Sequence, residues 1–174
     1  MKSKIIITIE GLISIFLAIY LTSLDNIFIS NYSIIGNTKE YRLVFMSWGL
    51  ISNLFLLMVL YHFEKTFGLI IAFISGVLVT ILPYLPLNYP ILANIHILMG
   101  FISFATYNYI IYKVIFIQRL YNIKLFNKIL QYWKSLLLLL AFFVAYYMHI
   151  NSLIELTYNL VMFTLLTYIY WKLC

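Results

Sequence analysis

Apolar runs, each close to the length of a membrane-spanning helix, fill most of this 174-residue chain. A helix that crosses a membrane needs about 20 mainly apolar residues. Only 9% of the residues are charged, whereas a soluble domain carries about 25%. We therefore expect one all-α integral membrane domain, a bundle of six transmembrane helices. The expected spans are 5–24, 43–61, 67–82, 91–112, 135–150 and 153–171.

The third and fourth expected spans are joined by a stretch that contains every proline of the chain, Pro83, Pro86 and Pro90. Proline ends helices because it lacks a backbone N–H and restricts the residue before it. The stretch therefore predicts a tight turn at a membrane surface. Another connection, residues 25–42, is polar, and its Gly36-Asn37 pair is a turn signal.

Residues 113–134 mix basic side chains with aliphatic and aromatic ones at a near-helical period. This pattern is typical of an amphipathic helix that lies on a membrane surface. We expect such a helix on the inner leaflet, separate from the next span or continuous with it. Its basic residues are Lys113, Arg119, Lys124, Lys128 and Lys134.

The distribution of lysine and arginine predicts the orientation of the bundle, because these residues accumulate in cytoplasmic loops. If the N-terminus is cytoplasmic, nine of the eleven Lys and Arg residues lie inside, and only Lys39 and Arg42 lie outside. We therefore expect both termini in the cytoplasm. The first span has no small-residue cleavage pattern after it, so we expect it to be retained. The abundance of Ile, Asn, Lys and Tyr favours a bacterial cell membrane.

Small residues spaced four apart predict where the helices pack closely. Such pairs let backbones approach each other inside lipid, where the hydrophobic effect does not drive helix association. We expect seams in three helices and a further one beside His96. The seam residues are Ala72, Gly76 and Thr80; Ala141 and Ala145; Ser14 and Ala18; and Gly100 and Ser103.

Several short motifs follow one another between residues 25 and 112. They are the element Ser30–Gly36 (SNYSIIG), Ser75-Gly76, Leu82-Pro83-Tyr84, and His96 with Gly100. In this order they resemble a bacterial six-span domain allied to the DRAM/Frag/Sfk membrane proteins. The resemblance implies a six-helix bundle and no defined chemistry. That family often has an acidic residue in the first element where this chain has Ile34.

Ionisable residues at membrane depth are costly and suggest function. Glu10 lies about 7 Å into the first span, at 1.5 Å per residue. Its carboxylate pairs with Lys2, Lys4 or a neighbouring helix, lies near the inner headgroups, or binds a proton or cation.

A second group of polar residues lies near the outer ends of the spans. We expect His96, His149 and Glu155 to converge on one outward-facing pocket, with Asp25 as a fourth member; the alternative is four isolated interfacial residues. A zinc site needs three or four ligands at suitable spacing, and no metal or cofactor site is expected, haem included. A serine hydrolase would need a serine with a histidine and an acid, and Ser33 with His96 is the one outward serine–histidine pairing.

The sequence favours a non-catalytic membrane protein that binds a lipid, a small hydrophobic molecule or a partner protein at its outer face, in an accessory or immunity-type role. No nucleic-acid partner is expected, because the cations flank apolar spans. One alternative is the substrate-capturing subunit of a small-molecule transporter, similar to those of energy-coupling-factor systems. Another is an intramembrane lipid hydrolase built on the outer polar residues.

Overall fold

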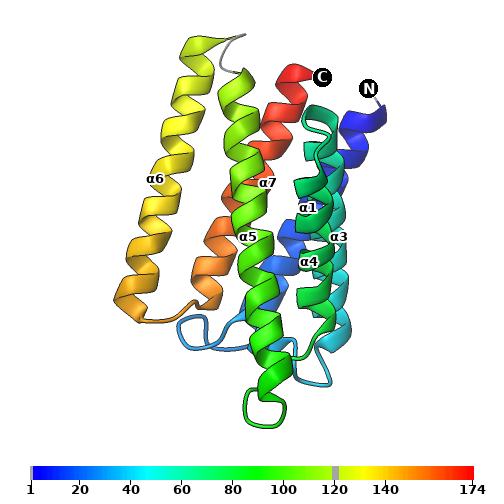
Figure 1. The fold of residues 1–174 in the computed structure, drawn as a ribbon, viewed down its shortest axis with the longest axis vertical. Coiled ribbons are helices and arrows are strands. Elements are labelled where there is room, and N and C mark those ends of the chain that lie inside the picture. Colours follow the sequence, from blue (N-terminus) through cyan, green and yellow to red (C-terminus); the bar gives the residue numbers. More distant parts are fainter. Residues whose placement is uncertain (1, 119–121) are drawn as a thin grey trace.

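The computed structural model describes residues 2–118 and 122–174, and within this part of the chain the secondary structure is entirely helical. Six helices run up and down the bundle, and a single helical turn, α2, lies in a connection at one end (Figure 1). The helices are α1 (Lys2–Ser23), α2 (Tyr32–Ile35), α3 (Arg42–Phe63), α4 (Phe67–Ile81), α5 (Pro90–Gln118), α6 (Ile123–Tyr147) and α7 (Ser152–Leu173).

Five of these helices, α1, α3, α5, α6 and α7, are long and apolar enough to cross a membrane. The helix α4 is apolar throughout but has 15 residues, which is shorter than the usual span. The all-helical prediction is confirmed for the described residues. Both termini lie at one end of the bundle, and the connection from α1 to α3 lies at the opposite end (Figure 1).

The prolines explain why α4 stops early and where α5 starts. Leu82, the residue before Pro83, has extended dihedrals (φ −71°, ψ 132°) and caps α4, because a residue followed by proline avoids the helical region. The chain then crosses to Pro90, the first residue of α5, a position where the missing N–H of proline does no harm. Residues 82–89 therefore form an irregular turn whose backbone groups need partners from elsewhere.

Close backbone approach joins α3, α4 and α5. A Cβ atom added at Gly76 of α4 would overlap Asn53 Oδ1 and lie 2.9 Å from Ser103 Oγ. A Cβ added at Gly49 of α3 would overlap the side chain of Thr80. These positions therefore require glycine, and the expected seam through Gly76 and Thr80 is confirmed.

Hydrogen bonds of polar side chains, to one another and to the backbone, accompany this close packing. The Tyr107 hydroxyl donates to Asn53 Oδ1 at 3.2 Å, and Asn53 Nδ2 donates to the Gly49 carbonyl at 2.8 Å. Ser103 Oγ of α5 donates to the Ala72 carbonyl of α4 at 3.1 Å. Inside lipid such bonds hold helices together because the polar groups have no water as an alternative partner.

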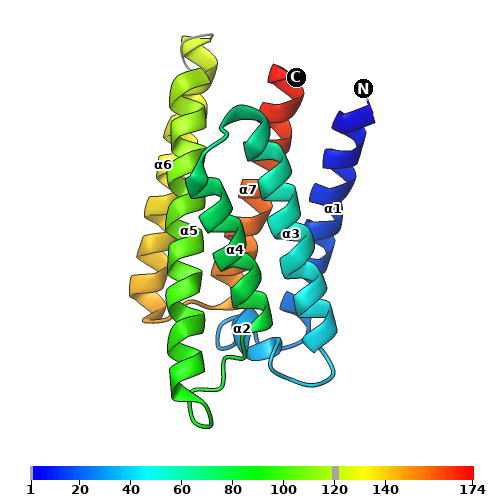
Figure 2. The same cartoon turned by 45° about the vertical axis from the view of Figure 1, so that its right-hand side comes forward.

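The helix α6 lies at one side of the bundle and α1 at the other, in both views (Figure 2). Ala141 and Ala145 of α6 are exposed, so this pair does not form the expected seam. The first half of α6 exposes Lys124 and Lys128, whereas its second half exposes Leu138 and Phe142. The exposed face of α6 thus changes from basic to apolar along its length.

The stretch 113–134, expected as one amphipathic segment, is divided in the structure. Residues 113–118 form the end of α5, and residues 123–134 form the first turns of α6. Arg119 lies outside the described residues. In the described part of this stretch, the periodic apolar residues therefore belong to α5 and α6, two long helices of the bundle. Lys113 of α5 forms an ion pair with Glu64, in the α3–α4 turn, at 2.7 Å.

Candidate functional site

The connection between α1 and α3, residues 24–41, forms a compact polar cap over one end of the bundle; we call it the outer cap, after the side of the membrane on which the lysine and arginine distribution predicts it. Its centre is α2, which starts where the Asn31 side chain accepts a hydrogen bond from the Ile34 N–H at 2.9 Å. Asparagine is among the best residues for this helix-starting position. The outer cap contacts two other connections, the α6–α7 turn and the proline-containing α4–α5 turn.

The α6–α7 turn is attached to the outer cap through backbone groups. The Ser30 carbonyl accepts hydrogen bonds from the Ser152 N–H at 2.7 Å and from the Ser152 hydroxyl at 2.8 Å. The Tyr32 N–H donates to Glu155 Oε2 at 2.7 Å. The first turn of α7 is therefore bound directly to the first turn of α2.

Tyr32 also anchors the outer cap inside the bundle. Its side chain is only 1% exposed. Its hydroxyl donates a hydrogen bond to the Ala18 carbonyl at 3.1 Å and lies 2.9 Å from Thr22 Oγ1. The Trp48 ring meets the Tyr32 ring edge-on, with 4.9 Å between centroids. Burial raises the pKa of Tyr32, so the phenol stays protonated and acts as a donor.

The α4–α5 turn is held by Asn37 and Arg42. Asn37 Nδ2 donates to the Tyr84 carbonyl at 2.6 Å, and Asn37 Oδ1 accepts from the Tyr84 N–H at 3.1 Å. The Arg42 guanidinium donates to the Gly36 carbonyl at 3.2 Å and also to the Ile81 carbonyl. These side chains supply partners for the backbone of the irregular turn that the prolines create.

A serine and a histidine meet where the outer cap touches α5. Ser33 Oγ lies 2.8 Å from His96 Nε2, and His96 Nδ1 lies 3.0 Å from the Leu82 carbonyl. A carbonyl oxygen can only accept, so Nδ1 carries the proton of the neutral ring. Nε2 is then the acceptor for the Ser33 hydroxyl. His96 is 5% exposed, whereas Ser33 is half-buried.

An open cavity of about 490 Å³ lies beside this pair. Asn37, which lines it, donates to the Ser33 carbonyl at 2.7 Å, and the Tyr84 ring, also in the lining, lies 5.4 Å from the His96 ring. The cavity thus has a polar edge toward Ser33 and His96 and an otherwise mostly apolar wall. The lining residues are Ile34, Asn37, Thr38, Tyr84, Leu85 and Pro86.

Two of the four residues expected in one outer pocket, His96 and Glu155, bind α2 through Ser33 and Tyr32. The other two, His149 and Asp25, attach to the start of the outer cap. His149 Nε2 lies 3.0 Å from the Phe28 carbonyl.

Asp25 accepts hydrogen bonds from the Ser30 hydroxyl and from the Asn26 N–H, the latter at 2.7 Å. These two donors hold the pKa of Asp25 below its ordinary value, the Ser30 hydroxyl most of all. Among the described residues, no hydrogen bond or ion pair joins any two of Asp25, His96, His149 and Glu155. Each of them instead binds a different position of the outer cap.

The carboxylate of Glu10, expected at membrane depth, is half-buried on α1. One of its oxygens, Oε2, is buried and has no hydrogen-bond partner among the described residues. The same holds for the hydroxyls of Ser14, one turn further along α1, and of Ser52 on α3. The pairing of Glu10 with Lys2 or Lys4, expected as one alternative, is not present among the described residues.

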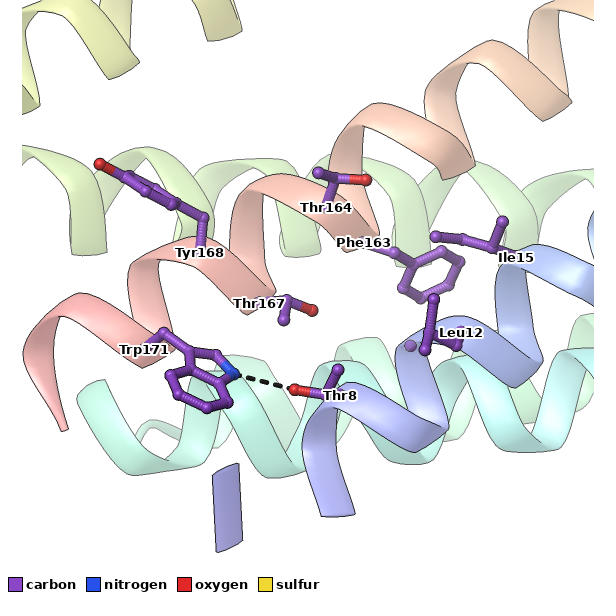
Figure 3. Close-up of a pocket in the computed structure, with 9 residues that line it drawn as sticks. Thr8, Leu12, Ile15, Phe163, Thr164, Thr167, Tyr168 and Trp171 are labelled. Atoms are coloured by element: carbon purple, nitrogen blue, oxygen red, sulfur yellow. Dashed lines mark hydrogen bonds between the residues drawn. The ribbon is translucent and has the colours of Figure 1, made fainter. Parts of the chain in front are cut away.

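A second cavity, of about 310 Å³, lies between α1 and α7 toward the end where the termini lie. Figure 3 shows Trp171 at one end, where its indole Nε1 donates to Thr8 Oγ1 at 2.8 Å. Lys4 donates to the Trp171 carbonyl at 3.1 Å, and its ammonium lies 5.4 Å from the indole centroid. The rest of the lining is mainly apolar, with Leu12 and Phe163 in view (Figure 3).

The sequence identified Ser33 and His96 as a pair. It did not identify Asn37 and Arg42 as hydrogen-bond partners of backbone groups in the α4–α5 turn. The Gly36-Asn37 turn signal predicted a turn at Asn37, but it did not show that Asn37 bonds to Tyr84. Tyr84 is more than 40 residues away along the chain, so no local pattern could connect the two.

The fold and the site define an all-helical protein of membrane-compatible helices, closed at one end by a polar cap with an open cavity. Comparison of the chain with family models, curated proteins and solved structures finds no match.

Proposed function

We propose that the chain is a six-span protein of a bacterial cell membrane, with α4 as a short sixth span and the outer cap on the external surface. The positions of the lysines support this orientation. Lys2, Lys4, Lys65 and Lys172 are at the end where both termini lie, and cytoplasmic ends of spans carry such an excess of positive charge. Lys39 is in the outer cap.

The proposed role is binding of an amphiphile, such as a membrane phospholipid, at the outer surface. The observation that supports it is the open cavity of about 490 Å³ beside Ser33 and His96. Ligand cavities are mostly apolar with a few polar groups that orient the ligand. Here Ile34, Leu85 and Pro86 provide apolar contact and Asn37 and Thr38 provide polar groups.

The position of the cavity fits a ligand that comes from the bilayer. The neighbouring turn and the first turn of α5 expose large apolar side chains, Leu87 with 96% and Ile91 with 74% of their surface accessible. Exposed apolar side chains next to a polar cap are expected where a protein meets the bilayer surface. A lipid headgroup at that depth is within reach of the cavity.

Photo-crosslinking in lipid nanodiscs tests this role. The probe is a phosphatidylcholine analogue with a diazirine near its glycerol backbone. We expect labelled peptides to be enriched at residues 34–38 and 84–86, and we expect the cavity-filling substitution Thr38→Trp to reduce this labelling. A matched control is Phe142→Trp on the exposed apolar face of α6, which leaves labelling of the outer cap unchanged. Equal labelling of the outer cap and of the α6 face would contradict the proposal.

A further inference from the structure

The Ser33–His96 pair has the arrangement of a nucleophile and its base. The hydroxyl of Ser33 donates to His96 Nε2 at 2.8 Å, within the range in which a base can accept a proton. The ring is held in the required tautomer by the Leu82 carbonyl, 3.0 Å from Nδ1. In serine hydrolases a third group orients the histidine in the same way, usually a carboxylate.

The accessibility of the two side chains matches these roles. His96 is 5% exposed and is covered on one side by the Tyr84 ring. Ser33 is half-buried. Asn37, which donates to the Ser33 carbonyl, and Tyr84, whose ring lies beside His96, line the cavity of about 490 Å³, whereas Ser33 and His96 themselves do not. A substrate in this cavity would therefore lie against the immediate neighbours of the pair, while the base stays shielded from bulk water.

The carbonyl that orients His96 is itself fixed by the sequence. Pro83 keeps Leu82 in the extended conformation, so the Leu82 carbonyl is not used by a continuing helix. The Arg42 guanidinium donates to the Gly36 and Ile81 carbonyls and so holds the outer cap against the end of α4, next to this carbonyl.

We propose that Ser33 is the nucleophile and His96 the general base for hydrolysis of an acyl ester of an outer-leaflet lipid bound in the cavity beside them. This inference rests on the proposed lipid-binding function and adds an activity to it. The substrate class follows from the position of the site: at the bilayer surface, the carbonyl carbon that a serine can attack is the ester carbon between the headgroup region and the acyl chain.

The reaction proceeds in two halves. The Ser33 oxygen forms a bond to the ester carbonyl carbon while its proton passes to His96 Nε2. The bond from that carbon to the lipid alkoxy oxygen then breaks, and the leaving oxygen takes the bond's electron pair and the proton from Nε2. A water molecule from the outer surface next attacks the acyl-Ser33 carbon and gives a proton to Nε2. The Ser33 oxygen leaves with that proton, and a free fatty acid is released.

A neutral carbonyl at Nδ1 stabilises the imidazolium less than a carboxylate would. Loss of a correctly oriented general base lowers rates by about 10²- to 10⁴-fold. We therefore expect slow turnover by the unmodified protein and loss of most of it when His96 is replaced.

The test is labelling of the purified full chain in nanodiscs with a fluorophosphonate probe, which reacts with activated serines. We expect one labelled peptide, containing Ser33, in the unmodified protein. Ser33→Ala abolishes the label, and His96→Gln lowers the labelling rate at least about 100-fold. Ser23→Ala, at an exposed serine that donates to the Tyr20 carbonyl, leaves the label unchanged. Absence of label from Ser33 in the unmodified protein overturns the proposal.

A second variant keeps the test decisive if Ser33→Ala disturbs the outer cap. Ser33→Cys preserves the size of the side chain and its contact with His96. In a Cys174→Ser background, iodoacetamide should modify Cys at position 33 faster than Cys placed at exposed position 23, because His96 assists thiolate formation. Equal or slower modification at position 33 contradicts the role of His96.

The lipid photo-crosslinking described above separates the two proposals. Cap-specific crosslinking without a fluorophosphonate label on Ser33 overturns the hydrolase and leaves lipid binding intact. Absence of both signals contradicts both proposals. Release of fatty acid from nanodisc phospholipid, abolished by Ser33→Ala, supports both.

Discussion

Glu155 Oε2 accepts a hydrogen bond from the Tyr32 N–H at 2.7 Å, across 123 residues of sequence. The bond joins the first turn of α7 to the first turn of α2. Further contacts attach the outer cap to the α6–α7 turn, to the α4–α5 turn and to α5, among them those of Ser152, His149, Asn37 and His96. The outer cap therefore connects the α4–α5 helix pair to the α6–α7 helix pair, and its stability should depend on these hydrogen bonds.

Glu155→Ala should destabilise the protein by about 1–3 kcal/mol, since a buried donor that loses its hydrogen-bond partner costs about that much. The Tyr32 N–H would lose its partner. Thermal unfolding in detergent, followed by size-exclusion chromatography, measures the effect. The matched control is Glu40→Ala, a carboxylate exposed on the outer cap, which should leave the melting temperature nearly unchanged. A similar melting temperature for both variants would disprove the importance of the Glu155 bond.

Gly76→Ala should destabilise the bundle by about 1–3 kcal/mol, the usual range for overpacking. The added methyl group would overlap Asn53 and lie 2.9 Å from Ser103 Oγ, so α4 would have to move away from its neighbours. Gly100→Ala is the control, because the nearest atom to its Cβ, Val79 Cγ2, lies at an ordinary 3.8 Å. Unfolding in mixed detergent micelles compares the two. Equal stabilities would mean that α3, α4 and α5 are not packed this closely.

The start of the outer cap should loosen in acid. Its hydrogen bonds lower the pKa of Asp25 in the folded state, so the ionised carboxylate adds stability at pH values above its unfolded pKa, which is about 4. This stability is lost as the pH falls through the folded pKa. Hydrogen-exchange protection of residues 26–30 should therefore drop a few-fold below about pH 4. In Asp25→Asn this pH dependence should disappear. If the pH dependence remains in that variant, a group other than Asp25 causes it.

The exposed Cys174 tests the proposed orientation. A membrane-impermeant maleimide should label it in inverted vesicles but not in intact cells. In a Cys174→Ser background, Lys39→Cys on the outer cap should give the opposite pattern. Labelling of Cys174 in intact cells would contradict the proposed topology and would mean that the outer cap lies in the cytoplasm.

The helices themselves were predictable from local sequence. The expected spans 5–24 and 43–61 differ from α1 and α3 by a few residues at each end, because the length of an apolar run limits a span directly. The helix α5 continues to Gln118, beyond residue 112, where the fourth span was expected to end. Basic residues interrupt the apolar pattern there, but they do not interrupt a helix.

The seams were predictable in part. Small residues mark positions where helices can approach, and Gly76 and Ala18 are buried as expected. Ala141 and Ala145 fit the same pattern but are exposed. Small size permits close approach without requiring it, and whether a partner helix is present depends on how the whole bundle is arranged.

The arrangement of the polar residues was decided by the tertiary structure. The sequence indicates that Asp25, His96, His149 and Glu155 lie near one end of the bundle, because each is close to the end of an apolar run. It does not indicate that each would bind a different point of the outer cap, or that Ser33 would lie 2.8 Å from His96. Apolar length and charge bias are local properties, whereas contacts between distant residues depend on the helix packing and on the irregular path that the prolines impose.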